Sequence, residues 1–239
     1  MNIRPYLIIN DISSQSIQGL LIQELAPISK PQQRTQVETV DGRDGDIVTP
    51  LGFAAYDKVV KIGLTYNYNI DDIISFFNSE GVVVFSNEPD KYYRFAIYEQ
   101  IDFERLIRFK SAEVTFHVQP FKFSDSEAEK TFNISGSPSL IEIRNSGNIY
   151  SRPTITITGS GVVTVSLNGS QILSLALGET AQTIIINSEQ MNAYGVDNTL
   201  LNRLVTGNYD NIKLKIGVNT ISLSGNVSTV KVDNYSRWI

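Results

Sequence analysis

Apolar and polar residues alternate without a break from residue 111 to residue 119. The apolar positions of this stretch are Ala112, Val114, Phe116 and Val118, and polar residues hold the positions between them. A sustained period of two is typical of a β-strand that buries one face and exposes the other. The pattern therefore predicts a half-buried strand, and this strand is the clearest element that the sequence indicates.

A helix is predicted over residues 69–80. Four apolar residues recur there at helical spacing: Ile70, Ile73, Ile74 and Phe77. Residues with this spacing lie on one side of a helix, so we expect that side to be buried.

The ends of the predicted helix carry their own signals. Asn69 is a residue type that caps helix N-termini, and Asp72 stands in the capping-box position. Gly81 follows the last turn, where a left-handed residue is common. Two strands, at residues 82–85 and 92–101, are predicted beyond it.

Further strands are predicted before the helix, at residues 7–9, 17–25, 34–40 and 60–64. Between the last two, residues 41–46 place glycines among acidic residues, which is typical of a tight turn with positive φ. Asp41, Asp44 and Asp46 are also oxygen ligands of the kind that calcium prefers. Their spacing does not match an EF-hand loop and no closing glutamate follows, so no metal site is predicted.

The composition of the chain changes after residue 123. Of its 23 aromatic residues, 17 lie in residues 1–123 and six lie beyond them. The stretch 124–130 is polar and has no apolar period. We therefore predict an N-terminal domain of residues 1–123 and a C-terminal domain of residues 124–239.

The second half is rich in Ser, Thr, Asn, Ile and Val, and short strands follow one another closely. They are predicted at residues 140–144, 154–158, 162–167, 171–177, 182–187, 211–216, 220–224 and 229–233. Asn168-Gly169 between two of them is a strong hairpin signal. The sequence thus predicts a mainly β protein whose second domain is a sandwich or jelly roll.

Charge and cysteine content exclude several classes of protein. A formal net charge of −5 and a pI near 5.0 provide no basic field for specific nucleic-acid binding. Residues 1–123 hold 12 basic and 16 acidic residues, a net charge of −4. With no cysteine there is no disulfide, thiolate metal site or thiol nucleophile. No signal peptide or membrane-spanning run is evident, so folding in a cytoplasm is expected.

No catalytic motif is present, and we predict that the chain is not an enzyme and needs no cofactor. His117 is the only histidine, and it lies on the polar side of its strand. Four carboxylates lie close in sequence, Glu88, Asp90, Glu99 and Asp102, as a glycosidase pair would require. Acidic proteins commonly contain such pairs, so a cell-wall hydrolase remains the weakest hypothesis.

Two aromatic sites are candidates for binding rings. Tyr92-Tyr93 is a possible stacking platform, although alternation places one tyrosine in the core and the other outside. In the second half, Tyr194, Tyr209 and Trp238 are the aromatic residues on which sugar binding would depend. The alternative function is therefore a carbohydrate-binding adhesion module that recognises bacterial surface glycans.

Several short motifs occur in an order that is more informative than any one of them. In the first half they are Asn10-Asp11 after a strand, Val40–Gly45, Glu88–Tyr93 after the helix, Arg105–Phe109, and Val114–Pro120 ending in Phe121–Phe123. In the second half they are Asn145–Gly147, Ser151–Ile157 and Gly159–Gly161. Together these motifs resemble the distal tail protein family of long-tailed bacteriophages, over nearly the whole chain.

The resemblance implies a structural protein of the virion tail tip, or baseplate, that is made in the host cytoplasm. It implies an N-terminal β domain with one helix that assembles into a hexameric ring around a DNA channel, and a peripheral C-terminal galectin-like sandwich. The implied partners are the tail tube protein, the tail-associated baseplate hub protein and a receptor-binding protein. The second half shows no long insertion like the arm with which some lactococcal members hold that last partner.

Overall fold

The computed structural model describes residues 4–77 and 80–239. The chain divides into two compact units, a first unit that extends to Asp125 and a second unit from Ser126 to Trp238. Strands hold 54% of the residues and helices 10%, so the predicted mainly β class is confirmed.

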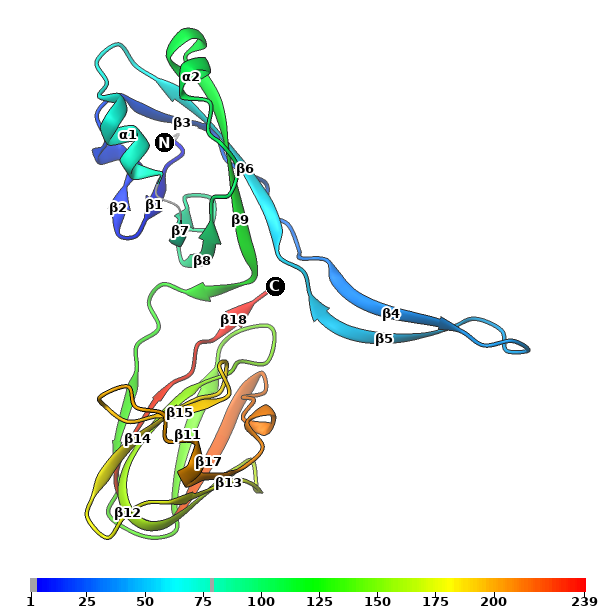
Figure 1. Ribbon diagram of the computed structural model, residues 1–239, viewed down its shortest axis with the longest axis vertical. Coiled ribbons are helices and arrows are strands. Elements are labelled where there is room, and N and C mark those ends of the chain that lie inside the picture. The colour runs from blue at the N-terminus through cyan, green and yellow to red at the C-terminus, as the bar shows by residue number, and fades with distance from the viewer. Residues whose placement is uncertain (1–3, 78–79) are drawn as a thin grey trace. The chain divides into compact units, whose positions relative to one another are not determined.

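One antiparallel sheet organises the first unit (Figure 1). Its strands are β1 (Leu7–Ile9), β2 (Ile12–Ser13), β3 (Leu20–Glu24), β6 (Tyr56–Leu64), β7 (Glu80–Phe85), β8 (Lys91–Ala96) and β9 (Ser111–Ser124). They lie in the order β2-β1-β7-β8-β9-β6-β3, so the short β2 and the bulged β3 are at the edges. A 3-10 turn, η1 (Ser14–Ser16), joins β2 to β3.

The strand predicted from alternation is confirmed as β9 and supplies the centre of the first core. Its four apolar residues are all at most 4% exposed. The ring of Phe116 lies 5.1 Å from that of Phe95, 5.7 Å from that of Phe85 and 6.4 Å from that of Phe77. Edge-to-face and tilted rings of this kind add to the burial energy of each residue, so Phe116 links three other elements.

The predicted helix is present as α1 (Ile70–Phe76), and Asn69 caps it by accepting from the backbone N–H of Asp71. The buried face differs from the prediction, because Ile73, Phe76 and Phe77 are buried whereas Ile74 is 45% exposed. The helix is also shorter than predicted, since it ends at Phe76; residues 78–79 of the predicted range lie outside the described residues. Gly81 therefore does not end it but lies inside β7, with a φ of +147°.

The strand predicted over residues 92–101 ends earlier, because β8 ends at Ala96. A second helix, α2 (Phe103–Phe109), follows it, whereas only one helix was expected. Asp102 caps it by accepting from the N–H of Arg105 at 2.8 Å. Leu106 buries completely against the sheet. A single buried residue leaves no helical periodicity in the sequence, so sequence analysis does not find α2. Its only local signal is the aspartate at its start, a residue type that commonly caps helix N-termini.

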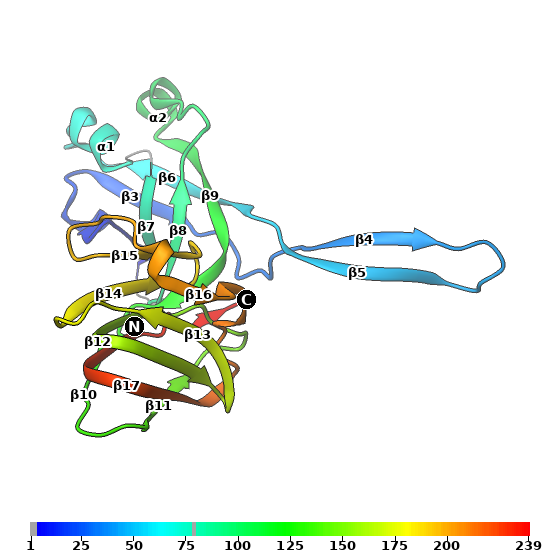
Figure 2. The same cartoon turned by 60° about the horizontal axis from the view of Figure 1, so that its bottom comes forward.

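Residues 33–53 form a separate two-stranded ribbon, β4 (Gln33–Thr39) and β5 (Asp46–Phe53), which we call the arm. The two strands pair only with each other, and Figures 1 and 2 show no other element of the first unit alongside them. β4 confirms the predicted strand, whereas β5 was not predicted because it contains Pro50. A proline is tolerated there because the ribbon has two edges and no third strand.

The turn at the tip of the arm confirms the expected backbone geometry, since Gly42 and Gly45 have φ values of +81° and +79°. We expect Gly45→Val to loosen the arm by about 1–2 kcal/mol, the cost of holding an L-residue in this region. No atom lies within 4 Å of an added Cβ, so backbone strain would be the whole effect. Amide hydrogen exchange along the arm should accelerate, while the melting temperature of the sheet stays constant. Unchanged exchange in the arm would contradict this expectation.

The second unit is built on one strongly curled antiparallel sheet. Its strands are β10 (Lys130–Asn133), β11 (Ser139–Asn145), β12 (Thr154–Leu167), β13 (Ser170–Ala176), β14 (Gln182–Asn187), β15 (Asn192–Tyr194), β16 (Val205–Gly207) and β17 (Gly217–Asp233). Short elements complete it: η2 (Asn202–Leu204), η3 (Tyr209–Asn211) and β18 (Arg237–Trp238). The hairpin at Asn168-Gly169 is confirmed, and both residues have positive φ.

Two long strands replace four of the short strands that the sequence predicted. β12 continues through Gly159 and Gly161, and β17 continues through Gly225, where turns were expected. The pairing of β12 with β17 shifts register here, so these glycines allow a bend instead of a chain reversal. The strand predicted at residues 211–216 is absent; Ile212 and Leu214 are buried there in irregular backbone.

Candidate assembly surface

The arm exposes apolar side chains along its whole length. Every residue of β4 is exposed, and β5 is exposed except for partly covered Ile47 and Phe53. Val37 lies opposite Val48, which puts both on one face, and they are 55% and 57% exposed. An isolated two-stranded ribbon is only marginally stable in water, so this arm has the character of a segment that binds another surface.

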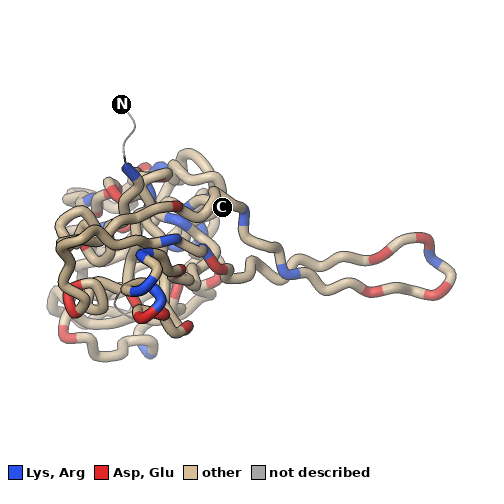
Figure 3. Tube along the Cα trace, turned by 90° about the horizontal axis from the view of Figure 1, so that it is seen from above, with Lys and Arg blue, Asp and Glu red and all other residues tan. Residues whose placement is uncertain are grey.

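The tip of the arm is acidic (Figure 3). Asp41, Asp44 and Asp46 surround the single basic residue Arg43, and Asp46 accepts from the hydroxyl of Thr39 at 3.3 Å. In the described chain, His, Asp and Glu side chains nowhere gather in groups of three or more that could hold a metal ion. The tip thus presents separate carboxylates on a glycine turn.

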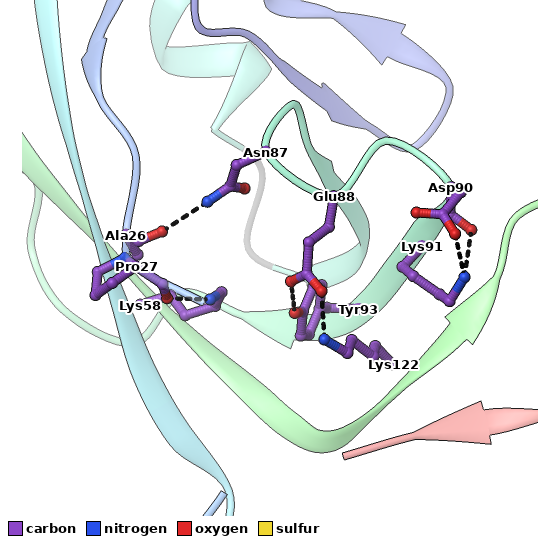
Figure 4. Close-up of polar contacts among 9 residues, drawn as sticks. All are labelled: Ala26, Pro27, Lys58, Asn87, Glu88, Asp90, Lys91, Tyr93 and Lys122. Carbon is purple, nitrogen blue, oxygen red and sulfur yellow. Dashed lines mark hydrogen bonds and ion pairs between the residues drawn. The ribbon is translucent and has the colours of Figure 1, made fainter. Parts of the chain in front are cut away.

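The segment that leads into the arm is held to the first sheet by two side chains (Figure 4). Lys58 on β6 donates from Nζ to the carbonyl of Pro27 at 2.9 Å. Asn87, in the turn between β7 and β8, donates from Nδ2 to the carbonyl of Ala26 at 3.0 Å. We call this group of contacts the arm root. Sequence analysis did not identify it.

Lys58 is 2% exposed, although it carries a charge. Its ammonium lies 5.2 Å from the ring centroid of Tyr93, 5.3 Å from that of Phe85 and 5.8 Å from that of Tyr56. Burial lowers the pKa of Lys58, and the negative charge of Glu88 acts in the opposite direction. Aromatic faces and a carbonyl thus compensate part of the cost of removing this ammonium from water.

Glu88 is a structural acid beside the arm root. It forms an ion pair with Lys122, and both side chains are nearly buried, at 12% and 13% exposed. The hydroxyl of Tyr93 donates to Glu88 Oε2 at 2.5 Å. Burial is the main cause that raises the pKa of Tyr93, and the neighbouring Glu88 is the second. The same two causes raise the pKa of Tyr56. Both tyrosines are therefore neutral hydrogen-bonding groups at ordinary pH.

Two of the other three carboxylates that the sequence offered for catalysis have local structural roles, and the third, Glu99, lines an open hollow at the surface. Asp90 pairs with its neighbour Lys91, and the Lys91 hydrogen bond holds the pKa of Asp90 below its usual value. Asp102 caps α2. His117 Nδ1 lies 2.7 Å from Asp57 Oδ1, on the polar face where it was expected. The structure does not bring these residues together around a hollow that excludes water.

Tyr92 and Tyr93 face opposite sides of β8, as alternation indicates. Tyr93 is 1% exposed. Tyr92 stacks on Phe123 with ring centroids 5.4 Å apart, and the Arg94 guanidinium lies 4.8 Å from the same phenylalanine ring. The exposed-side tyrosine of this pair therefore stacks on a ring of the protein itself, so this site gives no support to the predicted platform for a bound base or sugar.

The second unit gives little support to the sugar-binding alternative. Tyr194, Tyr209 and Trp238 are all half-buried, and Tyr209 packs against the core. Tyr150 is 37% exposed, but Arg237 and Lys213 lie over its ring at 4.7 Å and 5.4 Å from the centroid. Sugar binding by stacking needs an open aromatic face. Cationic groups of the protein lie over the Tyr150 ring, and the other three rings are only partly exposed.

Exposed aromatic residues are instead found on the first unit. Tyr66, Tyr98 and Phe109 are 99%, 75% and 73% exposed. Beside the edge strand β3, an open hollow of about 620 Å³ is lined in part by Leu21 and Gln23. An edge strand, exposed rings and an apolar arm on one unit are features of surfaces that associate with other protein.

No helix in the described part of the chain has the length and apolar character that crossing a membrane requires. The described residues thus form a two-unit β protein with an unpaired arm and an association-prone first unit. Exposed apolar and aromatic side chains of this kind are typical of surfaces that contact other protein chains.

Comparison with solved structures identifies the fold more closely. The chain is similar to the SPP1 phage Dit (gp 19.1) protein, which is described as a paradigm of the hub adsorption apparatus in phages that infect Gram-positive bacteria. The TM-score is 0.66 at 16% identity, and the match covers 96% of this chain and 98% of that one. At this identity the match establishes a shared fold.

Chains of the phage P2 baseplate, in its activated conformation, have the same fold. One, from the calcium form, matches with a TM-score of 0.52 at 11% identity over 96% of this chain and 97% of that one. Another, from the strontium form, matches with a TM-score of 0.50 at 12% identity over 98% of this chain and 99% of that one. No family model matches the sequence, and no curated protein matches it.

Proposed function

We propose that this chain is a distal tail protein of a long-tailed phage, a structural component of the tail tip without catalytic activity. The observation that carries the proposal is the full-length fold shared with the SPP1 hub protein, together with an arm that has no partner within its own described chain. The motif order resembles the same family independently of the fold. Its place would be the virion tail, after assembly in the host cytoplasm.

In this proposal the first unit forms a homomeric ring, with six copies expected from the resemblance. The arm of one copy binds a different surface on the next copy, and contacts between unlike surfaces generate rings when the rotation closes. Exposed Val37, Val48 and Leu51 supply the apolar part of this contact. The edge strand β3 and the exposed rings of the first unit supply candidate receiving surfaces.

The ring would connect the tail tube protein on one side to the tail-associated baseplate hub protein on the other. A receptor-binding protein is the expected partner of the second unit. The channel would pass DNA, and the net charge of −4 on residues 1–123 supports this use. An acidic wall repels phosphates, so DNA moves past it without binding.

Native mass spectrometry and negative-stain imaging of the purified chain, alone and mixed with its tail tube protein, would test the proposal. We expect ring-shaped particles of one stoichiometry that attach to the end of tubes. A chain that stays monomeric at high concentration and binds no tube would refute it. Saturable binding to cell-wall glycans in the absence of rings would favour the adhesion alternative.

A further inference from the structure

Lys58 occupies a position where the strand pattern calls for an apolar residue. It continues the series of alternate residues Val60, Ile62 and Leu64, which are the core-facing positions of β6 and are all buried. Burying an ammonium costs several kcal/mol before its partners compensate, and an apolar side chain of similar length would avoid that cost. The position of this lysine therefore needs a reason other than stability.

The contacts of Lys58 point to that reason, because its hydrogen bond is to the chain leading into the arm. Pro27 provides the carbonyl that accepts from Lys58, and Ala26 provides the carbonyl that accepts from Asn87. The adjacent carbonyls of Ala26 and Pro27 are thus held by the β7–β8 turn and by β6, respectively.

The returning strand of the arm is attached as well. The N–H of Ala54 donates to the carbonyl of Gln32 at 2.8 Å. The ring of Phe53 packs edge-on against Phe121 of β9 at 5.7 Å. Beyond these residues the strands of the arm pair with no other described strand, so its direction relative to the sheet is set at its root.

We propose that Lys58 and Asn87 are positioning residues, which hold the arm in one direction relative to the first sheet so that it can engage a neighbouring copy. This role depends on the proposed ring. A free arm samples many directions and must lose that freedom on binding, whereas a fixed arm has already lost it on folding. The buried charge would then exchange some stability for a defined arm direction.

The absence of native cysteine allows a direct test by spin labelling. One label is placed on the arm at Thr49→Cys, outside the apolar pair, and the other on α1 at Asp72→Cys; both positions are exposed. The labelled protein is mixed with excess unlabelled protein, so that only distances within one chain are measured by pulsed electron resonance. We expect one narrow distance distribution in the parent chain.

Lys58→Met and Asn87→Ala are each expected to broaden this distribution. Met is close to Lys in length and can fill the aromatic pocket, so the sheet should remain folded. Assembly should require more protein, by about ten-fold if one arm in ten retains the competent direction. Lys61→Met, on the same strand but exposed, is the matched control and should leave both measurements unchanged.

A distribution as narrow as that of the parent in both root variants would overturn the proposal. If Lys58→Met does not fold, Asn87→Ala decides alone: broadening supports the role and the parent width refutes it. The distance measurement needs no ring. A parent chain that forms no ring, while the root variants still broaden the distribution, would therefore reject the proposed function and leave the anchoring of the arm intact.

Discussion

Replacing Arg34–Gly52 by Asn-Gly is expected to give a folded chain that no longer forms rings. The change leaves Gln33 opposite Phe53, where a two-residue turn of this type joins antiparallel strands. It also keeps the contact between the aromatic side chains of Phe53 and Phe121. Because the deleted residues are almost all exposed, the free energy of unfolding should change by no more than about 1 kcal/mol.

Native mass spectrometry and thermal unfolding of the shortened chain measure both effects. A matched variant with a full-length arm, Val37→Thr with Val48→Thr, keeps the strand propensity and removes only the apolar pair. It should assemble more weakly than the parent chain and more strongly than the shortened chain. If the shortened chain forms rings as readily as the parent, the arm is not the contact between copies.

Phe116→Ala is expected to have the largest effect on stability, lowering the free energy of unfolding of the first unit by about 3–5 kcal/mol. The side chain is fully buried, and its ring contacts three other phenylalanine rings, from the C-terminal cap of α1, from β7 and from β8. Truncation leaves a cavity that three separate elements must collapse to fill. Chemical denaturation followed by circular dichroism, or by tyrosine fluorescence of the first unit, measures this loss.

Phe109→Ala is the control for this substitution, because Phe109 is also a phenylalanine but is 73% exposed. Its effect on stability should stay within about 0.5 kcal/mol. Equal losses in the two variants would mean that Phe116 is not the centre of the first core. The second unit has its own core, so its unfolding should be unaffected by either variant.

Sequence analysis correctly predicted those elements whose structure is determined by a local pattern of residues. β9 was evident because every second residue is buried, and the turn at Asn168-Gly169 was evident because two positive φ angles require such residues. The cap at Asn69 was found for the same local reason. The mainly β class follows from these elements and is confirmed.

The misses occurred where distant contacts outweighed the local pattern. Glycines such as Gly159 and Gly225 commonly indicate turns in a sequence. Here they lie inside continuous strands. The carbonyl oxygen of Asn226 would lie 2.4 Å from a Cβ added to Gly159, so only glycine allows the two backbones to approach this closely. α2 depends on one buried residue, Leu106, and a capping aspartate. The periodicity of apolar residues alone therefore distinguishes neither the continuous strands nor α2 from loops.

The assembly surface was missed for a different reason. The segment around Val37 alternates like a half-buried strand, but no part of the described chain covers it. Alternation shows that a strand has two unlike faces and does not show which molecule covers the apolar one. Lys58, in contrast, gave a readable signal: a charged residue in the core-facing series of β6 is costly enough to indicate a specific partner.

The continuous course of β12 and β17 has a mechanical consequence. β12 pairs with β14 through its first half and with β13 through its second half, and β17 lies beside it along almost its whole length. A pulling force on one half of the second unit is therefore transmitted to the other through covalent backbone and a shared ladder of hydrogen bonds. The register shift between Ser160 and Thr164 bends this path but ends neither strand, so the second unit should carry load as a single stiff body.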